Sequence, residues 1–210
     1  MTRTLLFLVL GWCCTGLSAA EPTADMAKGL YFPCQSCHGE QGEGSAAIHS
    51  PALAGQDAGY LARQLRHFRD GLRGGKTNDR YGKQMALMAA NLNDDTQIEL
   101  LANTISQFES WNNAFPPAVV SDKGEKLYSS CIVCHGAQGG GNSALSAPRV
   151  AGLDSLYLAT QLRHFRDGLR AYSPKDSAGQ QMRAAMSMLR SDDDIEAVSI
   201  YISSLNGNTN

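Results

Sequence analysis

The sequence has few cysteine residues to spare for structural use. It contains six, of which Cys13 and Cys14 lie in an apolar N-terminal segment. The other four fall into two short motifs at residues 34–38 and 131–135, so none is left for a structural disulfide. This excludes the small exported scaffolds whose fold depends on disulfide bonds.

Three further absences narrow the class of protein. The chain has 18 basic and 20 acidic residues and no block of lysine or arginine, which argues against a nucleic-acid partner. Its N-terminal apolar stretch is shorter than the roughly 20 residues that a membrane-spanning helix needs. No segment alternates apolar and polar residues as a half-buried strand does, so the expected fold is all-α.

The first twenty residues have the features of a secretory signal. Arg3 supplies the positive start, Leu5 to Leu10 the apolar centre, and Ser18-Ala19-Ala20 the small residues before a cleavage site. The apolar centre is too short and too rich in small residues to favour an uncleaved anchor. We therefore expect residues 1–20 to be a signal peptide that is cut after Ala20, which discards Cys13 and Cys14 and exports the rest.

The motif Cys-x-x-Cys-His occurs twice, as Cys34 to His38 and as Cys131 to His135. This pattern is typical of covalent haem attachment, in which both thiols bond to the haem vinyl groups and the histidine ligates the iron. A zinc site, a redox dithiol or a chance match would explain a single motif. Two copies behind an export signal predict two haem c groups, attached through Cys34, Cys37, Cys131 and Cys134, with His38 and His135 as axial ligands.

The chain is one unit written twice. The two motif histidines are 97 positions apart (135 − 38), and the same offset relates residues throughout both halves without a gap. Residues 64–73 and 161–170 are identical (QLRHFRDGLR). We expect a first domain at 21–108, a linker at 109–118 that contains Trp111, Phe115 and Pro-Pro, and a second domain at 119–210. Each is small for an apolar core, which a buried haem would enlarge.

Each unit is predicted to be helical. Residues 57–72 form an amphipathic helix with Leu61, Leu65, Phe68 and Leu72 on one face. Ser191 is placed to cap the last helix of the second unit, whose first turn is acidic. At least three helices per unit are expected, with loops between them. In the first unit the helices are predicted at 25–37, 57–72 and 94–108, and the loops at 41–50 and 74–81.

The sixth iron ligand decides between electron transfer and catalysis. A methionine thioether closes the site and raises the potential, whereas an open site admits small molecules. Met85 and Met182 are related by the repeat, and each ends a Gly-x-Gln-Met run. We therefore predict that Met85 and Met182 supply the sixth ligand of the two haem irons. Met88, Met186 and Met188 have no methionine at the equivalent position and are expected in the core.

The remaining histidines are weaker candidates. His49 has no counterpart in the second unit, while His67 and His164 repeat but lie opposite the apolar stripe of their helix, which predicts a surface position. Pro51 and Pro148 follow the haem motifs in loops that could supply the carbonyl to which a ligating histidine donates its second N–H. A simple loop turn is the alternative for these prolines.

With these residues in place, the chain resembles the cytochrome c4 family of dihaem class-I cytochromes along nearly all of its mature length. The second unit departs from the family pattern because Leu153 stands where glutamine is expected. His67 and His164 also stand where the family commonly has an acid. The resemblance rests on the paired Cys-x-x-Cys-His motifs, Pro-Ala-Leu-Ala-Gly-Gln at 51–56, the helix starts at Tyr60 and Tyr157, Thr77-Asn78-Asp79, and the spacings Met85/Leu92 and Met182/Leu189.

The resemblance implies two cytochrome c domains related by a pseudo-twofold axis, with the haem propionate edges close together. It implies a bacterial periplasmic carrier, with peripheral membrane association left open. The donor would be a quinol-oxidising complex or another cytochrome, and the acceptor a terminal oxidase or reductase. In the family the carbonyls of Pro51 and Pro148 would hold the ligating histidines.

Three functions were weighed. The matched ligand positions in both units favour a non-enzymatic electron carrier. A dihaem peroxidase or a sulfur-compound oxidoreductase is the enzymatic alternative, but a peroxidase needs one open haem and hence unequal units. A cytochrome subunit of a membrane complex would have the same chemistry with an obligate partner, and the sequence does not separate it from a free carrier.

Overall fold

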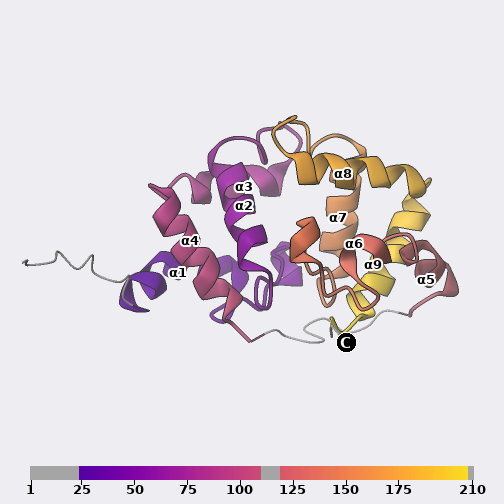
Figure 1. The fold of residues 1–210 in the computed structure, drawn as a ribbon, viewed down its shortest axis with the longest axis horizontal. Coiled ribbons are helices and arrows are strands. Elements are labelled where there is room, and N and C mark those ends of the chain that lie inside the picture. The colour runs from indigo at the N-terminus through magenta and orange to yellow at the C-terminus, as the bar shows by residue number, and fades with distance from the viewer. Residues whose placement is uncertain (1–23, 110–118, 208–210) are drawn as a thin grey trace, which may run out of the picture.

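The computed structural model describes residues 24–109 and 119–207, and it forms two helical halves side by side (Figure 1). Within these ranges there are no strands; isolated bridges pair Ser45 with Ser50 and Asn142 with Ala147. The all-α prediction is therefore confirmed. None of the described helices is long and apolar enough to span a bilayer. The predicted signal peptide, Trp111 and Phe115 lie outside the described residues.

The first half follows the predicted order of helices, with one addition. The added helix begins inside the loop predicted at 74–81 and continues through the Gly-x-Gln-Met run, for which no helix is predicted. The elements are α1 (Ala24–His38), the 3₁₀ turn η1 (Ala46–Ile48), α2 (Ala58–Arg69), α3 (Arg80–Ala89) and α4 (Asp95–Ser106).

The second half repeats this order, except that the helix of the haem motif is divided in two. α8 corresponds to α3 and, like α3, is a helix that the sequence pattern does not predict. The elements are α5 (Asp122–Tyr128), α6 (Ile132–His135), η2 (Ser143–Leu145), α7 (Ser155–Arg166), α8 (Ser177–Ala185), η3 (Met186–Met188) and α9 (Asp192–Ser204).

Each half has its own apolar core, in which the amphipathic helix packs on the last helix. Leu61 and Phe68 of α2 are buried as the periodicity predicts, while Leu65 and Leu72 of the same stripe are half-buried. Ile98 of α4 and Ile195 of α9 are fully enclosed at equivalent positions. The two cores contain different residues, so each half buries its apolar face independently of the other.

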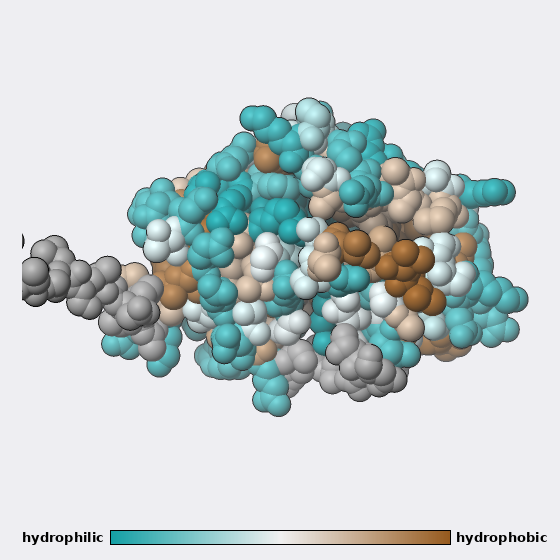
Figure 2. Space-filling view, viewed as in Figure 1, coloured by the Kyte–Doolittle hydropathy of each residue, from teal (hydrophilic) through white to brown (hydrophobic). Residues whose placement is uncertain are grey.

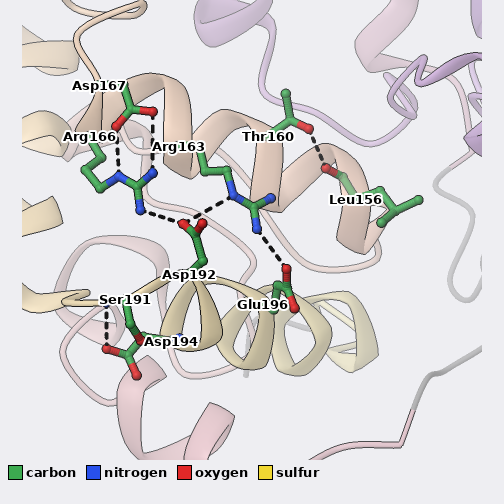
Figure 3. A network of polar contacts seen from close by, with 9 residues as sticks. All are labelled: Leu156, Thr160, Arg163, Arg166, Asp167, Ser191, Asp192, Asp194 and Glu196. Atoms are coloured by element: carbon green, nitrogen blue, oxygen red, sulfur yellow. Dashed lines mark hydrogen bonds and ion pairs between the residues drawn. The ribbon is translucent and has the colours of Figure 1, made fainter.

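Ion pairs join the same two helices along their exposed sides. Arg163 of α7 contacts Asp192 and Glu196 of α9 at 3.5 and 2.9 Å, and Arg166 contacts Asp192 at 2.6 Å (Figure 3). The first half repeats the arrangement between α2 and α4, where Arg66 contacts Asp95 and Glu99 and Arg69 contacts Asp95. Exposed pairs of this kind contribute little singly, so they fix the helix register more than they stabilise the fold.

The N-terminus of α9 carries the predicted cap in full. The hydroxyl of Ser191 accepts from the N–H of Asp194 at 3.1 Å, and the Asp194 carboxylate accepts from the N–H of Ser191 at 3.2 Å (Figure 3). This capping box satisfies two N–H groups that would otherwise lack partners at the helix end.

Ser191→Ala should lower the free energy of unfolding by about 1 kcal/mol, the usual cost of losing an N-cap side chain. Guanidinium chloride unfolding followed by circular dichroism would measure this. Ser187→Ala, which removes an exposed hydroxyl within η3, is the matched control and should change stability by less than about 0.5 kcal/mol. Equal effects for the two variants would mean that the cap contributes nothing specific.

Candidate functional site

Each motif histidine is held by the carbonyl predicted from the sequence. The Nδ1 of His38 donates to the carbonyl oxygen of Pro51, and the Nδ1 of His135 donates to that of Pro148, both at 2.9 Å. Both rings are buried, with 5% and 9% of their residue surface exposed. Nδ1 is therefore used by the protein in both halves, which leaves Nε2 as the nitrogen free to bind a metal.

A tight loop brings each proline back to its histidine. The N–H of Gly44 donates to the carbonyl of His38 at 2.8 Å, and the N–H of Gly141 donates to that of His135 at 2.9 Å. Both glycines have positive φ angles (+79° and +87°), and a Cβ at either would collide with the backbone that follows the proline. Glycine is required here because the two backbone segments approach too closely for any side chain.

A tyrosine ties the motif helix to the start of the same loop. The hydroxyl of Tyr31 donates to the carbonyl of Gly39, and that of Tyr128 donates to the carbonyl of Gly136, both at 2.7 Å. Both tyrosines are almost fully buried. Burial raises their phenol pKa, so the hydroxyls stay protonated and keep donating.

The motif thiols do not form disulfides. Burial, together with the neighbouring motif thiol, raises the pKa of Cys34 and of Cys131 to about 11. A redox dithiol needs a thiol that ionises readily near neutral pH, and these do the opposite. Of the readings left open for the motif, the redox dithiol is therefore the one that the electrostatics disfavour.

In the second half the predicted residues meet at one cavity of about 230 Å³. Met182, on α8, lines this cavity, which also reaches residues of the first half such as Pro51 and Tyr60. Its wall is mainly apolar, which suits a large flat ligand with polar groups at one edge. The motif contributes Cys131, Cys134 and His135 to the same cavity.

The methionines separate into different environments. Met85 occupies on α3 the place that Met182 occupies on α8, and both are half-buried. Met186 is buried in the core as expected. The expectation of core packing was wrong for Met88 and Met188, which are 39% and 43% exposed because they lie beyond the buried faces of their helices.

The helices that carry Met85 and Met182 start in the same way. The carboxylates of Asp79 and Asp176 accept from the N–H groups of Gly82 and Gly179, both at 2.8 Å. There is no room for a Cβ at either glycine beside the capping carboxylate. The glycine of each Gly-x-Gln-Met run therefore serves the N-cap, which fixes where the helix begins and hence where its methionine lies.

The residues present fit haem c. Each half offers two thiols that form no disulfide and a buried histidine whose orientation is fixed by a carbonyl. The second half adds an apolar cavity with a thioether on its wall. Thiols, imidazole and thioether are the donors by which proteins hold haem c and its iron.

Comparison with known proteins supports this fit. Residues 24–107 and 121–206 both match the family model described as cytochrome c. Cytochrome c4 of Azotobacter vinelandii is 34% identical over 98% of this chain and 100% of its own length. The crystal structure of reduced recombinant cytochrome c4 from Pseudomonas stutzeri is 30% identical, covers 87% of this chain and 98% of that chain, and has a TM-score of 0.70.

The chain belongs to the cytochrome c4 family. It is a dihaem electron-transfer protein with one covalently bound haem c in each half. The predicted fold of two tandem cytochrome c domains is confirmed. A protein named thiosulfate dehydrogenase electron acceptor, from Stutzerimonas stutzeri, is 33% identical over 82% of this chain and 78% of its own length.

The two halves of the cytochrome meet at a ring of buried polar residues. Arg73 donates to Gln64 at 2.8 Å and to Gln161 of the other half at 2.9 Å. Arg170 donates to Gln161 at 3.0 Å and to Gln64 at 3.2 Å. The exchange of partners is reciprocal, so the two halves are related by an approximate twofold axis in the arrangement that the resemblance implied.

This ring contains two cations and two neutral glutamines, and the buried carboxylate of Asp79 lies near enough to Arg73 to raise its pKa. Burial, and then the adjacent Arg73 cation, hold the pKa of Arg170 below its usual value. The Nε of Arg73 is buried without a hydrogen-bond partner among the described residues. Two guanidinium groups side by side in a buried site require anionic partners. Haem brings carboxylates, so this interface also fits the cofactor.

His67 and His164 are not surface residues, contrary to the expectation from the helical wheel. Only 8% of His67 is exposed, and its Nδ1 lies 3.7 Å from a carboxylate oxygen of Asp176 in the other half. His164 faces Asp79 at the same distance. The face opposite the core packs against the second domain instead of water. His49 is a half-buried loop residue that packs on Tyr81.

The contact between Gln56 and the backbone of Arg149 crosses the interface and has no twin. The side-chain amide of Gln56 donates to the carbonyl of Arg149 at 2.9 Å and accepts from the N–H of Arg149 at 3.0 Å. Leu153 occupies the equivalent position in the second half and cannot reciprocate. The first half therefore clamps the backbone beside Pro148, whose carbonyl holds His135, and sequence reasoning had noted only the missing glutamine.

The motifs also present different surfaces. Ile132 and Val133, between the second pair of cysteines, are 39% and 78% exposed, whereas Gln35 and Ser36 are polar. Figure 2 shows apolar atoms gathered over the second half, in the region where α6 is labelled in Figure 1, amid a largely hydrophilic surface. The residues between the two cysteines are thus more apolar in the second motif than in the first.

Gln56→Leu should lower the free energy of unfolding of the holo-cytochrome by about 1 to 3 kcal/mol, because it removes both part-buried hydrogen bonds between the Gln56 amide and the backbone of Arg149. Denaturant unfolding followed by haem absorbance would measure this. Gln41→Leu, at an exposed loop position, is the control. If both variants lose equally little stability, the backbone of Arg149 does not depend on the clamp.

A second prediction concerns pH. Burial lowers the pKa of both His67 and His164, and the cations Arg73 and Arg170 lower it further. At His67 the carboxylate of Asp176 opposes the shift and Arg63 adds to it. At His164 the carboxylates of Asp79 and Asp167 oppose it. The unfolded chain, with a histidine pKa near 6.5, therefore binds protons first as the pH falls. Stability should be highest above about pH 6.5 and decline below it.

The double variant His67→Gln, His164→Gln should show a weaker loss of stability between pH 7.5 and 5 than the natural protein, as measured by the guanidinium midpoint. His49→Gln removes a histidine outside these pairs and should keep the natural pH dependence. An unchanged slope in the double variant would show that the cross-interface histidines do not titrate in this range.

Proposed function

We propose that this cytochrome is an electron carrier with two six-coordinate irons, ligated by His38 and Met85 in the first half and by His135 and Met182 in the second. Cys34, Cys37, Cys131 and Cys134 form the thioether bonds to haem. The observation that carries the proposal is the cavity of the second half, which is lined by a histidine of fixed orientation, both motif thiols and Met182. The repeat extends this assignment to Met85.

The protein's own residues have two tasks in such a carrier. The carbonyls of Pro51 and Pro148 orient the histidines, and the N-caps at Asp79 and Asp176 set the start of the methionine helices. Haem supplies a one-electron couple when bound, and a thioether opposite the histidine favours a high potential. A rigid, closed coordination sphere supports fast electron transfer because little has to move.

The equality of the two halves supports a carrier over an enzyme. Both have the same histidine–proline bond, the same tyrosine tie and a methionine at the same helix position. A dihaem peroxidase would require one of the sites to open to peroxide. Among the described residues no group of three or more histidine, cysteine, aspartate or glutamate side chains forms a further metal site.

The proposal extends to domains and compartment. We place the first domain at 21–108, the linker at 109–118 and the second domain at 119–210, limits that are supported by the family matches at 24–107 and 121–206. Residues 1–20 act as a cleaved signal, and the mature cytochrome works in the bacterial periplasm. Covalent haem attachment and the absence of spare cysteines agree with an exported protein.

The partners are other redox proteins: a quinol-oxidising complex or another cytochrome as donor, and a terminal oxidase or reductase as acceptor. A second candidate donor is a sulfur-compound dehydrogenase. The similarity to a thiosulfate dehydrogenase electron acceptor, 33% identical over 82% of this chain, favours it. Stopped-flow reduction by each candidate donor would rank them, and the faster one at equal concentration is the better partner.

The first test is a visible spectrum of the matured protein during a potentiometric titration. Two c-type haems per chain, a methionine-to-iron charge-transfer band in the ferric state and two high-potential waves are expected. Carbon monoxide should not bind. A high-spin haem or one low-potential wave would contradict the carrier and advance the enzyme, for which peroxide turnover by the reduced protein would then be measured.

Met182→Ala should leave both haems attached but lower the potential of one wave and let carbon monoxide bind to one iron per chain, because the sixth position opens. Spectra of the reduced protein with and without carbon monoxide would measure this. Met188→Ala, at an exposed position in the same region, should behave like the natural protein. Carbon monoxide binding in neither variant would remove Met182 as a ligand.

A further inference from the structure

The two histidines differ in one contact near the iron. The hydroxyl of Ser50 lies 3.1 Å from the Nδ1 of His38, which also donates to Pro51 at 2.9 Å. Ala147 stands at the equivalent position in the second half, so the Nδ1 of His135 has the carbonyl of Pro148 and no hydroxyl. Among the described residues, this is a difference between the halves at the ligand itself.

The position of this hydroxyl is fixed by the fold. The N–H and carbonyl of Ser50 pair with the carbonyl and N–H of Ser45, at 2.9 and 2.8 Å. Ser50 is 8% exposed, and His38 is the hydrogen-bond partner that the structure gives its hydroxyl. Asn142 and Ala147 form the same bridge in the second half, so residue 147 faces its histidine from an equivalent place.

The direction of the hydrogen bond follows from the ligand role. When Nε2 binds iron, Nδ1 keeps its hydrogen and can only donate, so the Ser50 hydroxyl acts as an acceptor. A second acceptor on the same N–H draws the proton further from the ring. The ring then gains electron density, and Nε2 becomes a stronger donor to the metal.

We propose that Ser50 is a positioning residue that lowers the reduction potential of the first haem relative to the second. A stronger histidine donor stabilises ferric iron, which carries more charge, over ferrous iron. A single electron on the half-reduced protein therefore rests mainly on the second haem. The inference rests on the proposed assignment of His38 and His135 as iron ligands.

One charge difference acts in the same direction and has to be separated. Arg149, beside Pro148, has Ala52 as its counterpart, so a half-buried cation accompanies the second site alone. A nearby positive charge favours the reduced haem and raises its potential. Variants at 50 and 147 leave Arg149 in place, so any shift that they cause belongs to the hydroxyl.

The test is an exchange of the two residues, read by potentiometric titration of the matured dihaem protein. Ser50→Ala should raise the lower-potential wave alone, and Ala147→Ser should lower the other wave alone. We expect each to change the partition of one electron between the haems by about twofold to tenfold, where tenfold is about 59 mV for a one-electron couple. Met182→Ala, which perturbs the second site, assigns the waves to the halves.

A readout independent of potential is the exchange of the Nδ1 hydrogen of each ligating histidine, measured by nuclear magnetic resonance. Ser50→Ala should change the signal of His38 and leave that of His135 unchanged. In the potentiometric titration, Ser50→Thr, which keeps a hydroxyl, should show the natural potentials. If both waves persist and neither single exchange moves its wave, the Ser50 proposal is wrong while the ligand assignment stands. If the natural protein lacks two methionine-ligated haems, the proposed function has failed instead.

Discussion

The hydrogen bond from each motif histidine to a proline carbonyl is the interaction on which the rest of the structure depends. At 2.9 Å in both halves, it uses Nδ1, leaves Nε2 as the nitrogen that could bind a metal and fixes the orientation of the ring. Gly44 and Gly141 let the backbone return closely enough to make it, and Tyr31 and Tyr128 anchor the same loop from the motif helix. The glycine and the tyrosine of each half therefore help to hold the proline carbonyl against the motif histidine.

The interface between the halves solves a different problem, which is how to bury charge. Arg73 and Arg170 share Gln64 and Gln161 as acceptors and stack on Phe68 and Phe165, with the guanidinium carbon 4.4 and 4.2 Å from the ring centres. Neutral acceptors and aromatic faces lower the cost of burial but do not cancel the charge.

The buried residues Asp79 and Asp176 each cap a helix in their own half and contact a histidine of the other half. Asp79 caps the helix of Met85 and faces His164, and Asp176 caps the helix of Met182 and faces His67. Each methionine helix thus begins at a residue that contacts the opposite domain. Separating the halves would remove the contacts of both capping aspartates with the opposite domain, so the interface helps to fix where the two methionine helices begin.

Sequence patterns predicted the local features well because those features have local causes. The apolar stripe of α2 and the cap of Ser191 follow from residues a few positions apart, and each proline loop closes on a histidine 13 positions earlier. The sequence pattern predicts no helix at α3 or α8, although Gly82 and Gly179 each occupy the third position after an N-cap aspartate. The signal Asp-x-x-Gly, present in both units, could have revealed both helices.

The errors at His67 and His164 have a non-local cause. A helical wheel sorts residues between the core of one domain and everything else, and it treats everything else as solvent. In a duplicated chain the opposite face can be buried by the partner domain, as the cross-interface distances to Asp176 and Asp79 show. Two histidines in identical decapeptides were the available sign, since an exposed face has little reason to be repeated unchanged.

Duplication also makes the remaining differences informative. The halves agree at the thiols, the histidines, the proline carbonyls and the candidate methionines, so residues that differ beside these groups act on an otherwise constant background. Gln56 clamps the loop of His135 with no reciprocal clamp on the loop of His38, and Ser50 contacts His38 where Ala147 leaves His135 alone. Two equal haems would give an electron no preferred position. Small inequalities around a shared frame are enough to provide one, because each acts on the ligand without altering the fold that holds it.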